Sequence, residues 1–263
     1  MKIIVCVKQV PDTNEVRINN ETGTLIRDGV KSIINPDDMN AIEAALSIAE
    51  STDDSTVTVV SMGPPQAKAA LKEALAMGVD EAILLSDRVF GGSDTYATAT
   101  VLAAAIEKIG DYDIVLCGRQ AIDGDTAQVG PEIAEFLNIP QITYAKNLVV
   151  KDDKVIVERK IEEGHFDMEC KMPVLITAIK ELNEPRYCDA RLIFDKERMD
   201  SCLKVWTHED IPVDLNKIGV KNSPTHVYKS YVPTKDFSGE VFEGIATVIA
   251  EKLIESLKNQ NVI

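Results

Sequence analysis

Cysteine, histidine and positive charge are all scarce in this sequence. Its 263 residues include five cysteines and three histidines, and no two cysteines form a CxxC pair. We therefore do not expect a zinc or iron–sulfur site built by this chain alone. The 28 lysine and arginine residues face 43 aspartate and glutamate residues, which leaves a formal net charge of −15. This negative excess disfavours nucleic acid and anionic membrane surfaces as partners.

The sequence also lacks the common signatures of a self-sufficient active site. It contains no GxSxG, P-loop, HExxH or strand-associated GxGxxG pattern. The histidines His165, His208 and His226 are unclustered, and such histidines are more often surface residues than metal ligands. We predict no catalytic side chain and no metal ligand, so any redox chemistry needs a borrowed cofactor.

No apolar run is long enough to cross a bilayer. Met1 leads directly into KIIVCV, which has the length of a strand and none of the features of a signal peptide. Cys6 and Cys117 lie in apolar runs, where cysteine is most simply a small buried residue in a reducing compartment. We expect a cytoplasmic protein with no membrane insertion.

The centre of the chain, residues 113–137, combines a strand, a polar turn and a helix. Residues 114–117 form an apolar run, Gly118 interrupts it, and apolar residues resume at helical spacing from Val129. A turn in this order lies at the carboxyl edge of a sheet, where α/β folds bind ligands. The alternative is an acidic surface turn with an ordinary cap, and the bare pattern favours the two equally.

The turn itself, residues 123–130, suits an anionic or nucleotide ligand. Gly124 and Gly130 let backbone approach a ligand closely, and a cap at Asp125 or Thr126 would turn helix N–H groups toward a phosphate. Pro131 favours Gly130 as the cap instead, because proline is preferred at the first helical position. That assignment leaves residues 123–129 as an extended cradle.

Strands alternate with helices through the first half of the chain, and each crossover is long enough for parallel pairing. The predicted fold class is therefore α/β, with a doubly wound, mostly parallel, Rossmann-like sheet. Its strands are predicted at residues 2–10, 56–62, 82–86 and 114–117, and its helices near residues 35–49, 67–77 and 95–109. A short hairpin is predicted around residues 19–23, antiparallel strands at 147–150, 154–159 and 165–170, and a strand that rejoins the main sheet at 174–179.

The end of the chain is predicted to form an arm. Residues 212–237 are irregular, and residues 240–258 form an amphipathic helix whose apolar face includes Phe242, Ile245, Ile249, Leu253 and Leu257. Such a face needs a surface to cover, in this chain or in a partner. We predict two units, a nucleotide-binding α/β domain at residues 1–211 and a C-terminal arm at residues 212–263.

Four motifs in this order and spacing resemble the beta subunit of electron transfer flavoprotein. They are VKQVPDT at residues 7–13, NPDD at 35–38, QAIDGDTAQVGP at 120–131 and LNEPRY at 182–187. The resemblance runs from Lys2 to about Leu215. It implies an adenine-nucleotide site formed by the end of the first strand, the NPDD helix start, the strand end before Gly63 and the acidic loop. The implied residues are Cys6, Val7, Asn35, Pro36, Asp37, Asp38, Ser61, Met62, Gly63, Asp123, Gly124, Asp125, Thr126, Ala127, Gln128, Val129 and Gly130.

The resemblance leaves two nucleotides open. Ordinary members of this family hold AMP as a structural ligand, whereas electron-bifurcating members hold a second FAD that accepts hydride from NADH. Gly124 favours FAD, since a side chain there would crowd the phosphate region. The segment DRVFGGSDT at residues 87–95 also resembles the bifurcating group, and it adds Phe90, Gly91, Gly92, Asp94 and Thr95 as candidate FAD-binding residues. The alternative for this segment is a loop followed by a helix cap.

The resemblance also implies partners. The arm is expected on the alpha subunit. One electron would pass to ferredoxin or flavodoxin, and the other through the FAD of the alpha subunit to an acyl-CoA dehydrogenase or another flavin dehydrogenase. The family docks that dehydrogenase through the LNEPRY loop, which makes Glu184, Pro185, Arg186 and Tyr187 the candidate partner-binding residues. The alternatives are a well-packed surface turn at this loop, a subunit that only holds AMP, and an unrelated nucleotide-binding sensor.

Overall fold

The computed structural model describes residues 1–12, 17–18, 25–26, 31–226, 228 and 239–263. Its strands are β1 (Lys2–Cys6), β2 (Gln9–Pro11), β3 (Arg17–Ile18), β4 (Leu25–Ile26), β5 (Ser32–Ile34), β6 (Thr56–Met62), β7 (Glu81–Leu85), β8 (Ile114–Gly118), β9 (Gln141–Lys151), β10 (Lys154–Ile161), β11 (Gly164–Lys171), β12 (Val174–Ala178) and β13 (Leu203–Trp206). Its α-helices are α1 (Pro36–Glu50), α2 (Lys68–Met77), α3 (Thr95–Ile109), α4 (Val129–Phe136), α5 (Ala190–Phe194), α6 (Lys196–Ser201) and α7 (Ala246–Asn259). Short 3-10 helices are η2 (Pro65–Ala67), η3 (Arg88–Phe90) and η4 (Leu215–Lys217).

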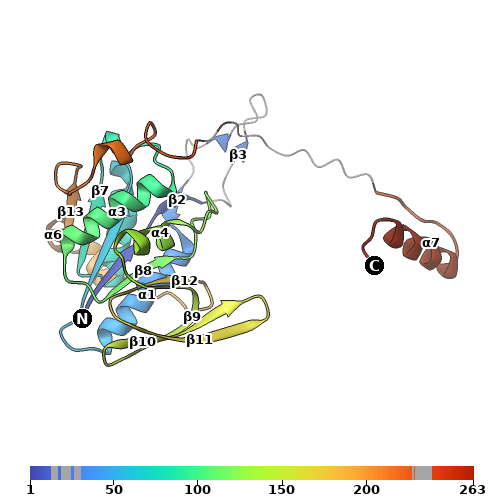
Figure 1. Cartoon of the computed structure of the whole chain (residues 1–263), viewed down its shortest axis with the longest axis horizontal. Helices are drawn as coiled ribbons and strands as arrows, with labels where there is room; N and C mark the ends of the chain where they lie inside the picture. The colour runs from blue at the N-terminus through green and yellow to red at the C-terminus, as the bar shows by residue number, and fades with distance from the viewer. Residues whose placement is uncertain (13–16, 19–24, 27–30, 227, 229–238) are drawn as a thin grey trace.

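Within these described residues, a nine-stranded sheet forms the centre of the molecule (Figure 1). The strand order is β11-β10-β9-β12-β8-β1-β6-β7-β13. Every pair from β9 to β13 in that order is parallel, while β10 pairs antiparallel with both β9 and β11. The predicted doubly wound α/β fold with antiparallel hairpins is confirmed.

Helices cover both faces of the sheet, which is why the central strands are largely buried and mostly apolar. On one face Ile3 and Val5 pack with residues of α1 and α2, and on the other Ile4 packs with residues of α3 and α4. The crossover helices therefore change face between α2 and α3, and the strand order reverses between β1 and β8. In open α/β sheets, ligands bind outside the carboxyl ends of the strands at this reversal.

The first predicted strand is two elements. β1 ends at Cys6, and residues 9–11 form β2, which pairs antiparallel with β5. The backbone N–H of Lys8 turns away from the sheet and donates to the Asp38 carboxylate, so the predicted single strand over residues 2–10 is wrong. β3 and β4 pair antiparallel as predicted, and the turn predicted at residues 19–23 lies outside the described residues.

The remaining boundaries follow the predictions closely, with one exception in the second half. The strand predicted from residue 147 begins at Gln141, because its first residues pair with β12 before its later ones pair with β10. Residues 190–201 form two short helices, α5 and α6, separated by Asp195. β12 lies between β9 and β8, which confirms that this segment rejoins the main sheet.

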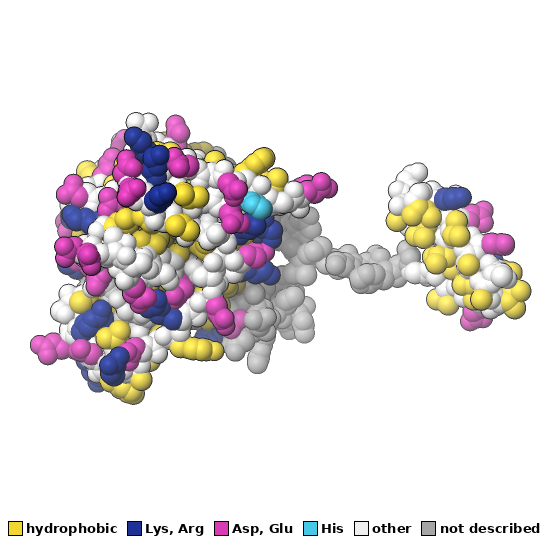
Figure 2. Space-filling model, turned by 90° about the horizontal axis from the view of Figure 1, so that it is seen from below, with side chains coloured by type: hydrophobic (Ala, Val, Ile, Leu, Met, Phe, Trp, Pro, Cys, Tyr) yellow, Lys and Arg dark blue, Asp and Glu magenta, His cyan; other side chains and the backbone are white. Residues whose placement is uncertain are grey.

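The C-terminal helix α7 lies apart from the sheet (Figure 1), and none of its residues is buried. It begins at Ala246 rather than at residue 240, since Gly244 has a φ of 142° that no helix accommodates. Phe242 and Ile245 therefore precede the helix, and apolar side chains gather along its visible side in Figure 2. Nearer the start of the predicted arm, Ile218 is buried in the core together with Ile211.

No helix in the described ranges combines the length and the apolar character that a bilayer-spanning segment needs. The division into units at residues 211 and 212 stays a prediction.

Candidate nucleotide-binding site

A buried carboxylate joins the ends of β1 and β8 to the start of α1. Asp38 Oδ2 accepts a hydrogen bond of 2.7 Å from the backbone N of Lys8, and Oδ1 accepts one of 2.9 Å from the backbone N of Gly118. Burial raises the pKa of Asp38 to about 7, against the opposing effect of these hydrogen bonds. Because Gly118 packs directly on Asp38, an added Cβ there would lie 2.2 Å from Oδ1. The carboxylate therefore sets the distance between the two strand ends at the switch point.

Asn35 holds the loop that follows β8. It occupies the N-cap position of α1 and is 1% exposed. Its Nδ2 donates to the carbonyl of Gln120 at 2.9 Å, and its Oδ1 accepts from the backbone N of Ile122 at 3.0 Å. An amide is needed because the side chain both donates and accepts, and a carboxylate would lose the donated bond. The predicted NPDD helix start is confirmed, and the side chain of its cap residue bonds to the acidic loop rather than to its own helix.

The acidic loop carries one ion pair to the first strand's end. Lys8 Nζ lies 2.7 Å from the Asp123 carboxylate, with both side chains partly exposed. Sequence reasoning did not name Lys8 as a site residue, although it lies inside the VKQVPDT motif directly after the first predicted strand. This pair brings two separately predicted segments together at the carboxyl edge.

Open space lies beside Gly124. The backbone N–H groups of Gly124 and Asp125 both donate to the carbonyl of Ala121, at 3.2 and 2.9 Å. Asp125 and Ala127 adopt left-handed φ values of 51° and 53°, which fixes an irregular course for the loop. Among the described residues, an added Cβ on Gly124 would meet no atom within 4 Å. The loop is held by its own contacts while the space at its glycine remains available to a ligand.

The helix after this loop starts earlier than predicted. α4 begins at Val129 with Gln128 as its N-cap, so the assignment of Gly130 as cap is wrong. An added Cβ on Gly130 would lie 2.7 Å from Cys117 Sγ and 3.0 Å from Thr177 Cγ2. Gly130 is therefore required for the close packing of α4 on β8 and β12. No side chain in the part of the chain that the structure describes caps the N–H groups at the start of α4, and unpaired N–H groups at a helix start suit a phosphate.

Thr95 connects the second predicted segment to the acidic loop. Its Oγ1 lies 3.2 Å from Gln128 Oε1 and 3.1 Å from Glu132 Oε1. Asp94 caps α3 by accepting from the backbone N of Ala97 at 3.0 Å, which confirms the predicted helix start. Residues 94–95 and 128 thus lie side by side at the same edge of the sheet.

The glycines of this second segment contact their own chain. Gly92 has a φ of 72°, and an added Cβ there would lie 2.9 Å from Val220 Cβ. An added Cβ on Gly91 would lie 3.2 Å from the carbonyl of Arg88, and Phe90 is buried in the core. Packing within the chain accounts for all three residues, and their proposed contact with FAD stays a prediction.

The strand ends at β1 and β6 contribute mostly backbone. Cys6 and Val7 are buried, and burial raises the pKa of the Cys6 thiol to about 12, so it remains protonated. Gly63 N donates to the carbonyl of Leu85 at 3.0 Å. Ser61 is fully buried, and its Oγ has no hydrogen-bond partner among the described residues. A buried hydroxyl without a partner is a position where a ligand atom would complete the bonding.

The predicted partner loop is anchored by one residue and displays another. Arg186 donates to Glu43 at 2.8 Å and also pairs with Glu50, so two carboxylates of α1 hold its pKa above the usual range. Pro185 precedes this anchor, and Tyr187 follows it with its side chain 98% exposed. Arg186 is therefore bound within the chain, while Tyr187 is available to a partner.

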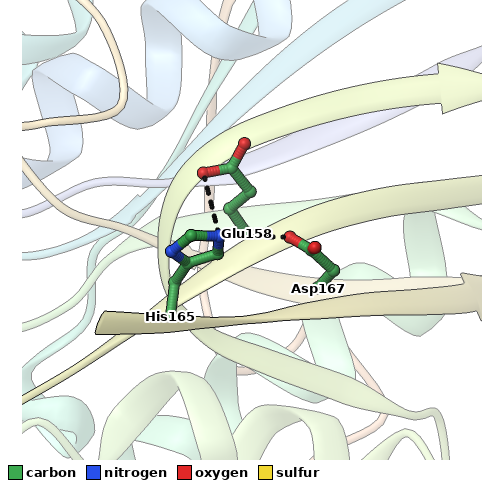
Figure 3. Close-up of side chains that lie close together, drawn as sticks. All are labelled: Glu158, His165 and Asp167. Carbon is green, nitrogen blue, oxygen red and sulfur yellow. Dashed lines mark ion pairs between the residues drawn. The ribbon is translucent and has the colours of Figure 1, made fainter. Parts of the chain in front are cut away.

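One cluster of metal-ligand residue types was not expected. Figure 3 shows Glu158 of β10 with His165 and Asp167 of β11 on one face of the hairpin. His165 Nε2 lies 3.9 Å from Glu158 and 3.6 Å from Asp167. Glu158 is already paired with Lys146 and accepts a bond from Asn147, both at 3.0 Å. We assign no metal to these exposed side chains, and the prediction of no metal ligand stays a prediction.

Comparison with known proteins connects this geometry to one family. The electron transfer flavoprotein domain matches residues 22–202. The chain is similar to the electron transfer flavoprotein subunit beta of Thermoanaerobacterium thermosaccharolyticum, with 56% identity over 263 residues and all of both chains covered. It is also similar to the caffeyl-CoA reductase-Etf complex subunit CarD of Acetobacterium woodii, with 49% identity over 264 residues and both chains fully covered. The acryloyl-CoA reductase electron transfer subunit gamma of Anaerotignum propionicum is 45% identical over 270 residues, again with both chains fully covered.

Proposed function

The chain belongs to the electron transfer flavoprotein family, and on this premise we propose that it binds FAD at the switch point between β1 and β8 as part of a heterodimer with an alpha subunit. When bound, the flavin accepts hydride from NADH and separates the two electrons, one to ferredoxin or flavodoxin and one to the flavin of the alpha subunit. Relatives whose names assign them to a caffeyl-CoA reductase complex and an acryloyl-CoA reductase support this redox role.

The open space at Gly124 is the observation that carries the proposal. The acidic loop is fixed by Asn35 and by the Asp123–Lys8 pair, yet nothing in the described chain fills the volume beside its glycine. In an acidic loop, phosphates must be bound by backbone N–H groups, and the uncapped start of α4 supplies them. The Ser61 hydroxyl adds an unused donor within the neighbouring strand. The residues present therefore fit an adenine dinucleotide.

A specific observation supports the alternative, which is a subunit that holds AMP. Gly91 and Gly92 pack against Arg88 and Val220, so their small size is explained without a flavin ring. A mononucleotide would need only the loop beside Gly124 and the start of α4. Both proposals use the same cradle and differ in how far the ligand extends toward Thr95.

Cofactor content separates these proposals. The heterodimer should be purified without added nucleotide, and its FAD and AMP should be extracted and quantified per heterodimer. Two FAD and no AMP, with one flavin bleached rapidly by NADH, is the result we expect. One FAD and one AMP would establish the alternative, and the absence of any flavin would rule out both.

The exposed helix α7 supports the proposed contact with the alpha subunit. None of its residues is buried, and its exposed apolar residues include Val248, Leu253 and Ile254. Apolar residues on one side of a helix stabilise it only when another surface covers them. A chain ending before residue 233 should therefore form a weaker heterodimer, measured by the dissociation constant of the two subunits. Equal affinity with and without residues 233–263 would refute this contact.

Tyr187 is the residue we propose for docking a flavin dehydrogenase such as an acyl-CoA dehydrogenase. Its exposed ring follows the Arg186 anchor, and aromatic residues are enriched at interface centres. Tyr187→Ala should slow electron transfer to the dehydrogenase while leaving FAD content unchanged. Phe166→Ala, which removes an exposed aromatic side chain from β11, is the matched control. Equal transfer rates in the two variants would exclude this docking role.

A further inference from the structure

Glu132, in the first turn of α4, lies between the starts of two helices. Its Oε1 is 3.1 Å from Oγ1 of Thr95, the first residue of α3. Glu132 directly follows the QAIDGDTAQVGP motif at residues 120–131, and sequence reasoning did not name it as a site residue. The carboxyl group therefore adjoins the cradle of residues 123–129 at the end that meets Thr95.

The surroundings of this carboxyl group contain more acceptor oxygens than donors. Thr95 has a single hydroxyl hydrogen, and two side-chain oxygens lie within hydrogen-bond distance of its Oγ1, Glu132 Oε1 at 3.1 Å and Gln128 Oε1 at 3.2 Å. The other oxygen of the carboxyl group, Glu132 Oε2, is buried and has no hydrogen-bond partner among the described residues. Buried side-chain oxygens nearly always have a partner, so Oε2 indicates a donor that a ligand brings.

No cation compensates this carboxyl group. In the described ranges, no lysine, arginine or histidine lies within ion-pair distance of Glu132. Burial is the largest effect on its pKa and raises it, as does the nearby Asp94 carboxylate, against the lowering effect of the Thr95 hydrogen bond. A buried carboxyl group without a cation costs stability, so packing alone favours an apolar side chain at this position. A ligand that donates to Oε2 accounts for a carboxyl group here.

The kind of ligand group follows from charge and hydrogen bonding. A phosphate is negative and offers only acceptor oxygens, so Glu132 repels it, whereas a hydroxyl group can donate to Oε2. The N–H groups at the start of α4 suit the phosphates themselves, so the group beside Glu132 is a hydroxyl-bearing one next to them. FAD carries such a group, the ribityl chain, beyond its phosphates. AMP ends at its phosphate.

We propose that Glu132 accepts a hydrogen bond from a ribityl hydroxyl of FAD and thereby makes the site favour the dinucleotide over AMP. The inference rests on the proposed function, and it names a residue that decides between FAD and AMP in the shared cradle. Thr95 holds the carboxyl group through Oε1, which leaves Oε2 for the ligand. Glu132 therefore acts in ligand selection, and no covalent bond is made or broken.

The test uses the nucleotide-stripped heterodimer carrying Glu132→Met, which keeps a flexible side chain of similar length and removes both carboxyl oxygens. Glu135→Met is the matched control, because it removes a carboxyl group from an exposed position of the same helix. Glu132→Gln is the rescue variant, since its amide can donate to Thr95 and still accept from the ligand. The measurements are the dissociation constants of FAD and of AMP by isothermal titration, and the thermal unfolding midpoint without nucleotide.

We expect Glu132→Met to weaken FAD binding about tenfold and not to weaken AMP binding. Its unfolding midpoint without nucleotide should be unchanged or higher, because a buried carboxyl group has been removed. Glu132→Gln and Glu135→Met should bind FAD within about threefold of the parent.

Unchanged FAD affinity in Glu132→Met would overturn the inference, and so would equal losses of FAD and AMP affinity, which would place Glu132 in the support of the shared cradle. A parent heterodimer that binds AMP but not FAD would instead refute the proposed function, and the inference with it. The parent titration therefore tests the function, and the comparison of variants tests Glu132.

Discussion

The loops after β8 and β7 reach the same edge of the sheet and have similar compositions. They differ in how closely the rest of the chain packs against their glycines. Both are acidic and contain glycine, and both precede a helix on the same face. For Gly124 in the first loop, no atom of the described residues lies within 4 Å of an added Cβ, whereas an added Cβ on Gly92 in the second would lie against Val220. A glycine beside a ligand edge is therefore not by itself a sign of a ligand.

The two loops also differ in the carboxylate that supports each. Asp38 beneath the first loop is buried, and desolvation raises its pKa to about 7. For Asp94 in the second loop, burial is the largest single effect and would raise the pKa, but hydrogen bonds from Ala97 and Thr225 lower it overall. The raised pKa of Asp38 should therefore make the free energy of unfolding fall as pH rises, whereas the lowered pKa of Asp94 should make it fall as pH decreases.

The largest expected effect is the pH dependence due to Asp38. Between its unfolded pKa of 3.8 and its folded pKa of about 7, the folded state retains a proton that the unfolded state releases. The free energy of unfolding should fall by about 1.4 kcal/mol for each pH unit that the pH rises in this window. Asp38→Asn should remove that part of the slope, measured by urea unfolding between pH 4.5 and about 6.5.

Asp94→Asn is the control for this measurement. A lowered pKa contributes stability that is present above 3.8 and lost as pH falls below it, so this variant should differ from the parent by a constant amount between pH 5 and about 7. Parallel slopes for the parent and Asp38→Asn would show that Asp38 is already ionised across the window.

The next effect concerns Gly92. Gly92→Ala places a Cβ at 2.9 Å from Val220 Cβ in a backbone conformation with φ of 72°. Strain and crowding together should lower the free energy of unfolding by about 1–3 kcal/mol, and FAD content at saturation should be unchanged. Urea unfolding of Gly92→Ala and of Gly92→Ala/Val220→Gly measures the crowding part, which the second substitution should relieve. Lost FAD with full stability would instead assign Gly92 to the ligand.

Local signals predicted the elements, and long-range contacts decided the roles of several residues. The start of α3 followed from a cap that is readable within the segment itself, where Asp94 accepts from the backbone N of Ala97. The break after β1 could not be read there, because the acceptor for Lys8 N is Asp38, thirty residues away. Likewise, Gly130 looked like a cap next to Pro131, whereas its size is required by Cys117 and Thr177 on other strands.

The candidate site could also be predicted only in part. Its segments were predicted from the ordered motifs. The Asp123–Lys8 pair and the binding of Arg186 to α1 could not be, because each joins side chains that are distant in sequence.

The smallest expected effect on stability tests the comparison most directly. Gly124→Ala adds a Cβ where no atom of the described ranges lies within 4 Å and where φ is not in the left-handed region, so the free energy of unfolding should change by less than about 0.5 kcal/mol. If the ligand occupies that space, nucleotide affinity should fall about tenfold, equivalent to about 1.4 kcal/mol. Gly239→Ala is the matched control, because its added Cβ also meets nothing and it lies outside the cradle. Isothermal titration of nucleotide-stripped heterodimer with FAD and with AMP measures the affinities. Equal affinity in both variants would mean that solvent fills the volume beside Gly124. The loop after β8 would then hold no ligand at its glycine, as we expect for the loop after β7.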